Sequence, residues 1–431
     1  MADLPHVAVL GAGFCGLEFC RHVDTARVRV TVVDRQNHHL FQPLLYQVAT
    51  AGLSAIDIAR PIRGILRRKP NLQVRMARVD GIDLARHCVR LDGQPSLEFD
   101  YLLLALGGRS SYFGHDEWAE FAPGLKTLDD AVRIRRQLLL AFERAETEPD
   151  LERQRELMTI VVIGGGPTGV ELAGAAAELT RGGLREDFDR IDTRRARILL
   201  IEGGTAVLGH FPPSLSASAR RQLERLGVEV RTGRRVQHIG LGTVDLGDEQ
   251  IRAANILWAA GVAPVPEIRS LGAPLDHAGR IEVEPDLSVP GRPTVFAGGD
   301  IVAVSDGRGG TVPGLAPAAM QMGRFIARVI NDEARRGAVG EPRTRPRFHY
   351  VDKGTLATIG RSAAVAQIGR LHFTGLSAWI TWLLVHLVFL VGFRNRVSVF
   401  ATWVTSYFTY RRRARIILGS DAIGTAPPPE R

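Results

Sequence analysis

Residues 6–18 read HVAVLGAGFCGLE, and this stretch decides the fold of the first part of the chain. The apolar run at 7–10 predicts a buried strand, and the apolar residues after Gly16 predict a helix. Between them lies Gly11-Ala12-Gly13-Phe14-Cys15-Gly16, which has the spacing of a dinucleotide-binding turn. In such a turn the first glycine permits the bend, the second lets the backbone approach a pyrophosphate, and the third lets the helix pack on the strand.

An acidic residue ends the next predicted strand. The apolar run at 28–33 leads into Asp34, followed by Arg35. A carboxylate at this distance from the glycines suits the 2′-hydroxyl of a ribose. A glycine-rich turn in an unrelated α/β protein is the alternative, and the strand, helix and acid together weaken it. We therefore predict a bound dinucleotide here.

The same pattern occurs a second time. The apolar residues 160–163 lead into Gly164-Gly-Gly166-Pro167-Thr168-Gly169, and the strand predicted at 198–201 ends in Glu202. Two such patterns predict two dinucleotides, a flavin in the first fold and a nicotinamide in the second. Three further strands end in glycine turns and return the chain to these folds. The turn after the first of these strands contains Ala105 and Gly107, the turn after the second contains Gly261, and the turn after the third contains Gly299 and Asp300.

The predicted fold class is α/β, with two nested Rossmann-like dinucleotide-binding domains of the disulfide-reductase-like flavoprotein fold and a C-terminal amphipathic membrane-anchoring region. We expect a discontinuous FAD-binding domain at 1–120 and 290–345, an NADH-binding domain at 121–289, and the membrane-associated region at 346–431. Residues 74–79 and 88–91 are predicted to belong to a β-meander. Helices are predicted at 128–155 and 320–334, and a charged surface loop at 181–197.

Composition narrows the class of partner. The 431 residues carry a net charge of +9, nearly all of the basic charge is arginine, and lysine occurs only at 69, 126 and 353. A basic balance fits anionic cofactors, an anionic membrane or nucleic acid, but no nucleic-acid-binding motif accompanies it. The first strand starts by residue 6, so we expect no signal peptide. Three cysteines, at 15, 20 and 88, indicate a reducing compartment without structural disulfides.

The C-terminal part is apolar and then basic. Residues 376–393 carry one ionisable group, His386, and as a helix would reach roughly 27 Å, just short of a bilayer core. In the next apolar run Ser398, Thr402, Thr405 and Thr409 share one helix face, and arginines follow at 411–413 and 415. We expect this region to lie in the interface of an anionic membrane. The alternatives for this region are a single membrane span and a buried dimer interface. A single span would place the C-terminal arginines on the side opposite the cofactor domain, which violates the positive-inside tendency.

Together these residues resemble the type II NADH dehydrogenases, single-chain flavoproteins that pass electrons from NADH to membrane quinone without pumping protons. The resemblance covers nearly the whole chain. Its specific segments are NHHLFQPLLYQVAT at 37–50, VVIGGGPTGVELAG at 161–174, AGGDIV at 297–302, DKGTLATIGR at 352–361 and the tail from 385 to 415. The resemblance implies non-covalent FAD, NADH as substrate, no metal, and a peripheral location on the cytoplasmic face of the inner (plasma) membrane.

The resemblance also implies roles for single residues. It places Asp300 on the flavin ribityl chain, Glu171 near the flavin ring, and Gln321 and Lys353 at the quinone site. The alternative for Glu171 is an acid that favours the helix dipole, and for Lys353 a solvated loop residue. The family's quinone motif Ala-Gln-x-Ala-x-Gln reads Ala316-Pro317-Ala318-Ala-Met-Gln321 here, so the first glutamine is absent. The other expected cofactor contacts are Gln42, Val79, Pro317 and Ala318, and residues 37–54 are expected to lie over the flavin.

Other functions stay open at this stage. Cys15 and Cys20 fall in the glycine turn and first helix and would point to different helix faces, which disfavours a redox pair of the glutathione-reductase type. No cysteine follows Cys88, which disfavours a sulfide:quinone oxidoreductase. A soluble ferredoxin- or rubredoxin-type reductase and a non-enzymatic flavoprotein that senses NADH are the remaining alternatives. Formation of a homodimer is also open.

Overall fold

The computed structural model describes residues 4–307, 310–340, 345–409 and 414–417. Within these ranges the chain forms two compact units, each with its own parallel sheet. The first unit comprises Met1–Leu40, Ala59–Arg109 and Val262–Lys353, and the second comprises Phe41–Ile58, Ser110–Gly261 and Gly354–Arg431. Each core is therefore assembled from segments far apart in the sequence.

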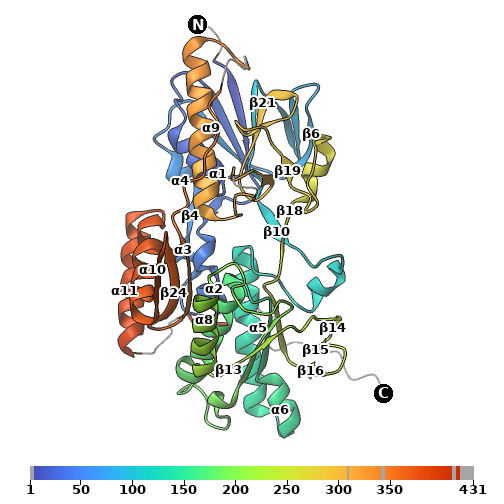
Figure 1. Ribbon diagram of the computed structural model, residues 1–431, viewed down its shortest axis with the longest axis vertical. Coiled ribbons are helices and arrows are strands. Elements are labelled where there is room, and N and C mark those ends of the chain that lie inside the picture. The colour runs from blue at the N-terminus through green and yellow to red at the C-terminus, as the bar shows by residue number, and fades with distance from the viewer. Residues whose placement is uncertain (1–3, 308–309, 341–344, 410–413, 418–431) are drawn as a thin grey trace. The chain divides into compact units, whose positions relative to one another are not determined.

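A six-stranded sheet forms the core of the first unit, in the order β20-β21-β9-β1-β2-β5. Its strand β21 is labelled in Figure 1. Neighbouring strands are parallel, except that β20 and β21 are antiparallel. All five residues of β1 are buried, as expected for a central strand covered on both faces. The bounds are β1 His6–Leu10, β2 Arg29–Asp34, β5 Leu72–Met76, β9 Tyr101–Leu104, β20 Ser288–Val289 and β21 Arg292–Ala297.

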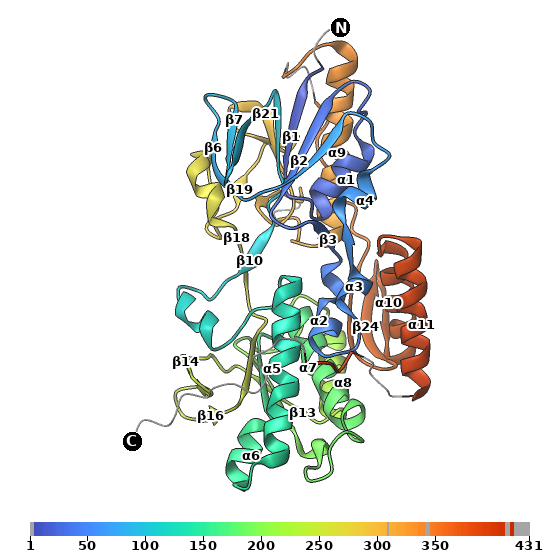
Figure 2. The ribbon, with the colours of Figure 1, turned by 180° about the vertical axis from the view of Figure 1, so that it is seen from behind.

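Helices α1 (Phe14–His22) and α9 (Ala316–Arg336) pack tightly against each other beside this sheet (Figure 2). A Cβ at Gly323 of α9 would lie 2.2 Å from the carbonyl oxygen of Cys15 on α1. The Glu18 carboxylate is buried in this contact and accepts from Arg324 Nε at 2.6 Å. The helix predicted at 320–334 is thus confirmed and is longer at both ends.

The first unit also contains a three-stranded antiparallel meander of β6 (Val79–Asp83), β7 (Cys88–Leu91) and β8 (Gln94–Glu98). The prediction that residues 74–79 belong to this meander was wrong for residues 74–76, because these lie in β5, which pairs in parallel with β2 at the edge of the main sheet, while Val79 begins β6 of the meander. An apolar strand pattern does not reveal which sheet a strand joins. Smaller elements are β3 His38–Leu40, β4 Ala59–Pro61, α4 Ile62–Leu66, β10 Gly108–Ser110, β18 Val262–Pro264, β19 Ile281–Glu282 and β22 Val302–Ala303.

The second unit is built on a four-stranded parallel sheet in the order β13-β12-β11-β17. The strands are β11 Thr159–Ile163, β12 Arg197–Glu202, β13 Val228–Thr232 and β17 Asn255–Trp258, and the helices α7 (Pro167–Glu178) and α8 (Pro213–Arg225) follow β11 and β12. The helix predicted at 128–155 is two helices, α5 (Leu128–Thr147) and α6 (Leu151–Leu157). Pro149 separates them, and the Asp150 side chain caps α6 by accepting from Glu152 N.

The expected surface loop at 181–197 is partly buried. It begins within a π-helical turn at Leu179–Gly183 and contains a 3₁₀ turn at Thr193–Arg195, and Ile191 and Thr193 are buried. The Glu146 carboxylate accepts hydrogen bonds from the backbone of residues 189–191, which ties this segment to α5. An antiparallel sheet of β14 (His238–Gly240), β15 (Thr243–Asp245) and β16 (Gln250–Arg252) packs on the same unit.

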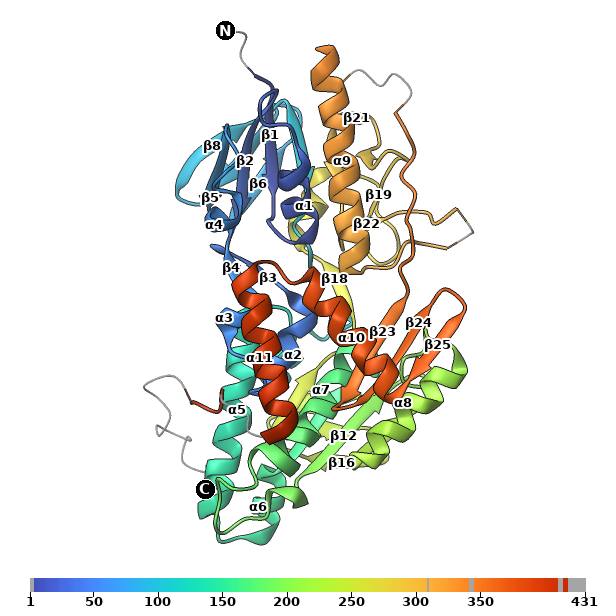
Figure 3. The same cartoon turned by 90° about the vertical axis from the view of Figure 1, so that its left-hand side faces the viewer.

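The C-terminal part of the second unit is an antiparallel sheet of β23 (Thr355–Gly360), β24 (Ala363–Ile368) and β25 (Leu371–Thr374), followed by α10 (Gly375–Phe389) and α11 (Phe393–Thr409). Helix α10 packs on β24, and α7 packs on β23 (Figure 3). The approach of α7 is close, since a Cβ at Gly174 would lie 1.7 Å from the Ile359 carbonyl oxygen. Among the described residues, no helix combines the length and apolar character that crossing a membrane requires.

Residues 41–58 belong to the second unit and contain α2 (Leu45–Ala49) and α3 (Ala55–Ile58). Helix α11 is anchored to them, because Trp403 Nε1 donates to Gln47 Oε1 at 2.9 Å and Ser398 Oγ donates to Asp57 Oδ1 at 2.8 Å. The predicted polar face of α11 thus contacts protein at Ser398. The structure confirms the α/β class and the two dinucleotide-binding sheets that the glycine patterns predicted.

Candidate functional site

The first glycine turn joins β1 to α1, and the space around its three glycines differs. Gly11 has a φ of +101°, and a Cβ there would lie 2.2 Å from the Ala105 carbonyl oxygen. A Cβ at Gly16 would lie 1.9 Å from the Gly11 carbonyl oxygen. A Cβ at Gly13, by contrast, would meet no described atom within 4 Å. Two glycines are therefore needed to fold the turn, and Gly13 faces open space that a phosphate could enter.

The second turn, between β11 and α7, repeats this geometry. Gly164 has a φ of +111°, and its Cβ would lie 2.7 Å from the carbonyl carbon of Ala259. A Cβ at Gly169 would lie 1.8 Å from the Gly164 carbonyl oxygen, whereas a Cβ at Gly166 would meet no described atom within 4 Å. The two turns thus present the same open middle glycine.

An acid braces each turn in the same way. Asp34 Oδ2 accepts from Ala12 N at 2.7 Å, and its Oδ1 accepts from Gln36 N at 2.8 Å. Glu202 Oε2 accepts from Gly165 N at 2.6 Å, and its Oε1 accepts from Gly204 N at 2.5 Å. An ionised carboxylate has about four acceptor positions, so each acid can also receive a ribose hydroxyl. The backbone contacts hold both carboxylates at the edge of the glycine turn.

The helix that follows each turn leaves its N-terminus open to an anion. Gly13 and Gly166 are the N-caps of α1 and α7, and the described residues provide no side-chain hydrogen bond at either cap. Neither first turn contains an acidic residue. Free backbone N–H groups and the positive end of the helix dipole both favour a phosphate at such a position.

His39 is a residue of the first site that the sequence analysis did not single out. Its ring is buried, and Nδ1 lies 3.0 Å from the Ala12 carbonyl oxygen, which can only accept. We therefore assign the proton to Nδ1. Burial lowers the pKa of His39, so the ring is neutral and Nε2 is an acceptor. Nε2 is buried without a partner among the described residues, which suits a ligand hydroxyl or amine. Its place in the histidine-rich segment at 37–50 was the available signal.

Glu171 lies in the second turn of α7, beyond the residues that interact most strongly with the helix dipole. Its Oε1 accepts a long hydrogen bond of 3.4 Å from Thr358 N on β23. Burial raises the pKa of Glu171 to about 8, although the neighbouring Thr358 backbone and Trp382 side chain lower it in part. The carboxyl is therefore largely protonated at neutral pH and can hold and transfer a proton.

Helix α10 places Trp382 beside Glu171. The Trp382 indole N–H lies beside the Glu171 carboxyl without reaching hydrogen-bond geometry, and it is buried without another partner in the described chain. The His386 ring stacks on Trp382 at 4.3 Å between centroids, and its Nδ1 lies 2.8 Å from the Trp382 carbonyl oxygen. Burial lowers the pKa of His386 to about 4, so this histidine is neutral. Nothing in the sequence indicated that Trp382 would lie beside Glu171.

Gln321 and Lys353 both belong to the first unit. The Gln321 amide pairs with the backbone of one residue, since its Nε2 donates to Val351 O and its Oε1 accepts from Val351 N, both at 3.0 Å. Val351 precedes Lys353 by two residues, and the Lys353 side chain is exposed. The structure thus connects the segments of these two predicted site residues through the backbone of Val351.

Several predicted cofactor residues lie at strand ends of the two sheets. Ala105 N donates to Leu10 O at 2.8 Å, which places the end of β9 beside the first turn. Asp300 lies next to Gly108 and Gly314, because the Cβ positions of those glycines fall 3.5 and 3.6 Å from its atoms. Gln42 Nε2 donates to Lys126 O at 3.1 Å in the second unit. Among the other predicted cofactor residues, the structure buries Val79 and Ala318 and exposes Arg35 and Thr168. Pro317 lies in the first turn of α9. The backbone φ angles of Gly107 and Gly261 are positive.

Residues 5–323 match the family described as pyridine nucleotide-disulphide oxidoreductase, and residues 353–412 match the NDH2 C-terminal domain. The type II NADH:quinone oxidoreductase Ndh of Mycobacterium tuberculosis is 41% identical over 96% of this chain and 91% of its own length. The chain belongs to the type II NADH:quinone oxidoreductase family. Another similar protein is the Arabidopsis thaliana internal alternative NAD(P)H-ubiquinone oxidoreductase A1, 30% identical over 96% of this chain and 86% of its own. The structure of NDH2 from Plasmodium falciparum in complex with NADH shares the fold, with a TM-score of 0.87 and 20% identity. The match covers 96% of this chain and 100% of the Plasmodium chain.

The cysteines of this type II NADH:quinone oxidoreductase family member do not form a redox pair in the structure. Cys15 and Cys20 are free and buried on α1. Burial raises the pKa of Cys15 to about 12 and also raises that of Cys20, so both thiols stay protonated. Because the thiolate is the reactive form, neither is activated for disulfide chemistry.

Proposed function

We propose that this protein oxidises NADH and reduces a membrane quinone through bound FAD, without pumping protons. The observation that carries the proposal is the duplicated turn, in which an open glycine, a helix N-terminus that no described side chain caps and a braced acid occur twice. Two such turns fit two dinucleotides in one chain. Membership of the type II NADH:quinone oxidoreductase family supports the assignment of FAD to the first and NADH to the second.

The residues of the first turn fit FAD. The space at Gly13 and the amides of α1 would receive the pyrophosphate, Asp34 would accept from the adenosine ribose, and His39 Nε2 would accept from a further ligand group. FAD, when bound, supplies the hydride acceptor and the two-electron donor of the reaction. We propose residues 1–120 and 290–345 as the FAD-binding domain, with Asp300 on the ribityl chain, and 121–289 as the NADH-binding domain.

Substitution of Glu202 by glutamine should narrow the preference for NADH over NADPH by about tenfold, because a carboxylate repels a 2′-phosphate and an amide does not. The ratio of kcat/KM for the two coenzymes measures this. Glu224→Gln on α8, which removes an exposed acid paired with Arg220, is the control and should leave the ratio unchanged. Equal efficiency with both coenzymes in the unmodified protein would contradict the assignment.

Reduction of a quinone consumes two electrons and two protons, so the protein needs a proton donor as well as the flavin. We propose Glu171 for this role, since its raised pKa keeps the carboxyl protonated at neutral pH. Trp382 shields the carboxyl from water on the side of α10. Lys353 would contact the quinone, and Gln321 would act as a positioning residue by orienting the segment that leads to Lys353.

Gln321→Ala should raise the apparent KM for quinone by about tenfold, because it removes both hydrogen bonds to Val351. Rapid reduction of the flavin by NADH, followed by stopped-flow absorbance, should be unchanged. Gln321→Glu keeps an acceptor for Val351 N but loses the donor, and we expect an intermediate KM. A variant impaired equally in flavin reduction would assign Gln321 to another role.

The C-terminal helices support attachment to a membrane surface. Exposed apolar side chains follow one another every fourth residue along α10, opposite the face that packs on β24. Leu376, Ile380, Leu384 and Val388 form this exposed stripe. We propose that the stripe and the exposed residues Val397, Phe400 and Val404 of α11 lie in the lipid interface, on the cytoplasmic face of the plasma membrane.

The arginines around these helices have mixed roles in the structure. Arg396 donates to the Leu390 and Val388 carbonyl oxygens that end α10, at 2.8 and 2.7 Å. Arg415 forms an ion pair with Asp187 and donates a hydrogen bond to the Gly183 carbonyl oxygen. The predicted arginines at 411–413 lie outside the described residues. We therefore expect attachment to the membrane to depend more on the apolar stripe than on the described arginines.

The test of the proposed function is NADH oxidation by the purified, detergent-solubilised protein with a short-chain quinone, before and after added FAD. We expect turnover that depends on both the quinone and the bound flavin. Reduction of ferricyanide without reduction of quinone would favour a soluble ferredoxin-type reductase. Flavin that NADH does not reduce would favour a non-enzymatic role.

A further inference from the structure

Arginines lie directly beside the acid that would bind the NADH ribose. The chain that leaves β13 is hydrogen-bonded to the loop after Glu202, because Arg234 N donates to Glu202 O at 3.0 Å and Gly233 N donates to Gly204 O at 2.7 Å. Arg235 lies against the same loop, with its Cγ 3.2 Å from the Cβ position of Gly203. These residues stand at the carboxyl end of the parallel sheet, where dinucleotides bind.

Such arginines conflict with a preference for NADH. A guanidinium binds phosphate strongly, so an unpaired arginine here would attract the 2′-phosphate of NADPH and oppose the repulsion from Glu202. The preference therefore depends on what else these arginines contact.

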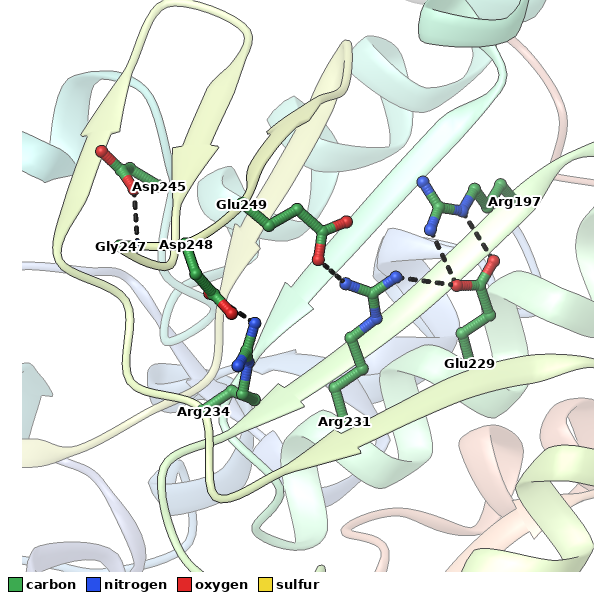
Figure 4. Close-up of polar contacts among 8 residues, drawn as sticks. All are labelled: Arg197, Glu229, Arg231, Arg234, Asp245, Gly247, Asp248 and Glu249. Carbon is green, nitrogen blue, oxygen red and sulfur yellow. Dashed lines mark hydrogen bonds and ion pairs between the residues drawn. The ribbon is translucent and has the colours of Figure 1, made fainter.

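The turn between β15 and β16 supplies two acids that pair with Arg231 of β13 and with Arg234, which follows the strand by two residues (Figure 4). Asp248 Oδ1 accepts from Arg234 Nη2 at 2.5 Å, and Glu249 accepts from Arg231 Nη1. The Arg234 guanidinium lowers the pKa of Asp248, which keeps this exposed carboxyl ionised. Asp245 Oδ1 accepts from Gly247 N at 2.7 Å and so shapes the turn that presents Asp248.

The two arginines differ in how many acids hold them. Arg231 also donates to Glu229 Oε2 at 3.3 Å, and Arg197 binds Glu229 through two hydrogen bonds of 2.6 and 2.8 Å (Figure 4). Arg231 would therefore remain paired if Glu249 were lost. For Arg234, Asp248 is the one acidic partner within the described part of the chain.

We propose that Asp248 is a specificity-determining residue, which pairs with Arg234 and so withholds this guanidinium from a coenzyme 2′-phosphate. The proposal rests on the proposed NADH-binding function of the second fold. Asp248 acts through Arg234 and has no contact with the reacting atoms. Arg235 is present whether or not Asp248 is changed, so it does not affect a comparison between variants.

The experiment compares Asp248→Asn with Glu249→Gln. Both remove one negative charge from the same turn, but only the first leaves an arginine without an acidic partner among the residues that the structure describes. We expect Asp248→Asn to raise the ratio of kcat/KM for NADPH over NADH by about fivefold, the size of one exposed charge interaction, through a lower KM for NADPH. Glu249→Gln should leave the ratio unchanged, and Asp248→Asn combined with Arg234→Gln should restore it. Added salt should reduce the gain, since the freed charge is exposed.

A binding measurement separates this proposal from the proposed function. Calorimetric titration with adenosine 2′-monophosphate should show tighter binding to Asp248→Asn than to the unmodified protein, while adenosine 5′-monophosphate should bind both equally. Equal effects of Asp248→Asn and Glu249→Gln, or no tighter binding of the 2′-phosphate, would overturn the proposal. If the unmodified protein fails to oxidise NADH, the proposed function fails, and the titration still decides the role of Asp248.

Discussion

Glu171→Gln should slow quinone reduction by about a hundredfold while the reduction of flavin by NADH stays unchanged. Removal of a positioned general acid typically costs this much or more. Glutamine keeps the size of the side chain and can still accept from Thr358 N, but it has no acidic proton to transfer. The measurement is stopped-flow, in which flavin reduction by NADH and flavin reoxidation by quinone are followed separately.

The pH dependence provides a second readout of the same role. Burial raises the pKa of Glu171 to about 8, so the protonated form that can donate is present below this pH and is lost as the pH rises through it. Quinone reduction by the unmodified protein should therefore decline above about pH 8. In Glu171→Gln this decline should disappear, and the residual rate should be flat across the same range.

Glu178→Gln is a suitable control, because Glu178 lies on the same helix and also contacts the β23–β24 sheet, by accepting from Arg361 N. It should leave the pH profile of quinone reduction in place. Loss of flavin reduction in Glu171→Gln, or an unchanged decline above pH 8, would show that Glu171 does not donate the proton.

Changing both Leu384 and Val388 to glutamate should release the protein from membranes, with NADH-dependent reduction of a water-soluble acceptor retained. The two side chains are 56% and 63% exposed, so the substitutions leave the packing of α10 on β24 intact. Burial of each such side chain in lipid contributes about 1.5–3 kcal/mol, and the added charges oppose an anionic surface. Partition onto anionic vesicles should therefore fall by at least about a hundredfold.

Deletion of the whole tail is a less suitable test, because α10 is part of the second unit. Ala378 and Trp382 of α10 are buried, and Ala378 packs with Ala364 and Ala366 of β24. The control is Arg220→Glu with Arg221→Glu on α8, away from the exposed stripe. On neutral vesicles, where both variants are compared, only the Leu384 and Val388 variant should lose partition. Membrane retention of the Leu384 and Val388 variant would locate the attachment elsewhere.

The sequence was sufficient for features whose chemistry is local. Each glycine turn demands particular residues within a few positions of a strand end, and the acid follows at the end of the next strand, so both dinucleotide folds could be recognised from spacing alone. The structure confirms the folds, with β1 and β11 at the predicted runs and the helix at 320–334 extended to Ala316–Arg336. The break after α5 is also determined by local sequence, namely Pro149 and the capping residue Asp150. The helical periodicity across 128–155 nevertheless led to the prediction of one continuous helix.

Tertiary structure alone decided the features that depend on burial and on distant partners. Trp382 reaches Glu171 only because α10 and α7 cover the same three-stranded sheet, and that enclosure raises the Glu171 pKa. Packing of distant segments likewise buries the His39 ring away from water, and it brings the Val351 backbone within hydrogen-bond distance of Gln321. Asp248 meets Arg234 because a hairpin folds over a parallel sheet. Residue type and spacing encode a turn, but desolvation and ion pairing depend on which surfaces the complete fold brings together.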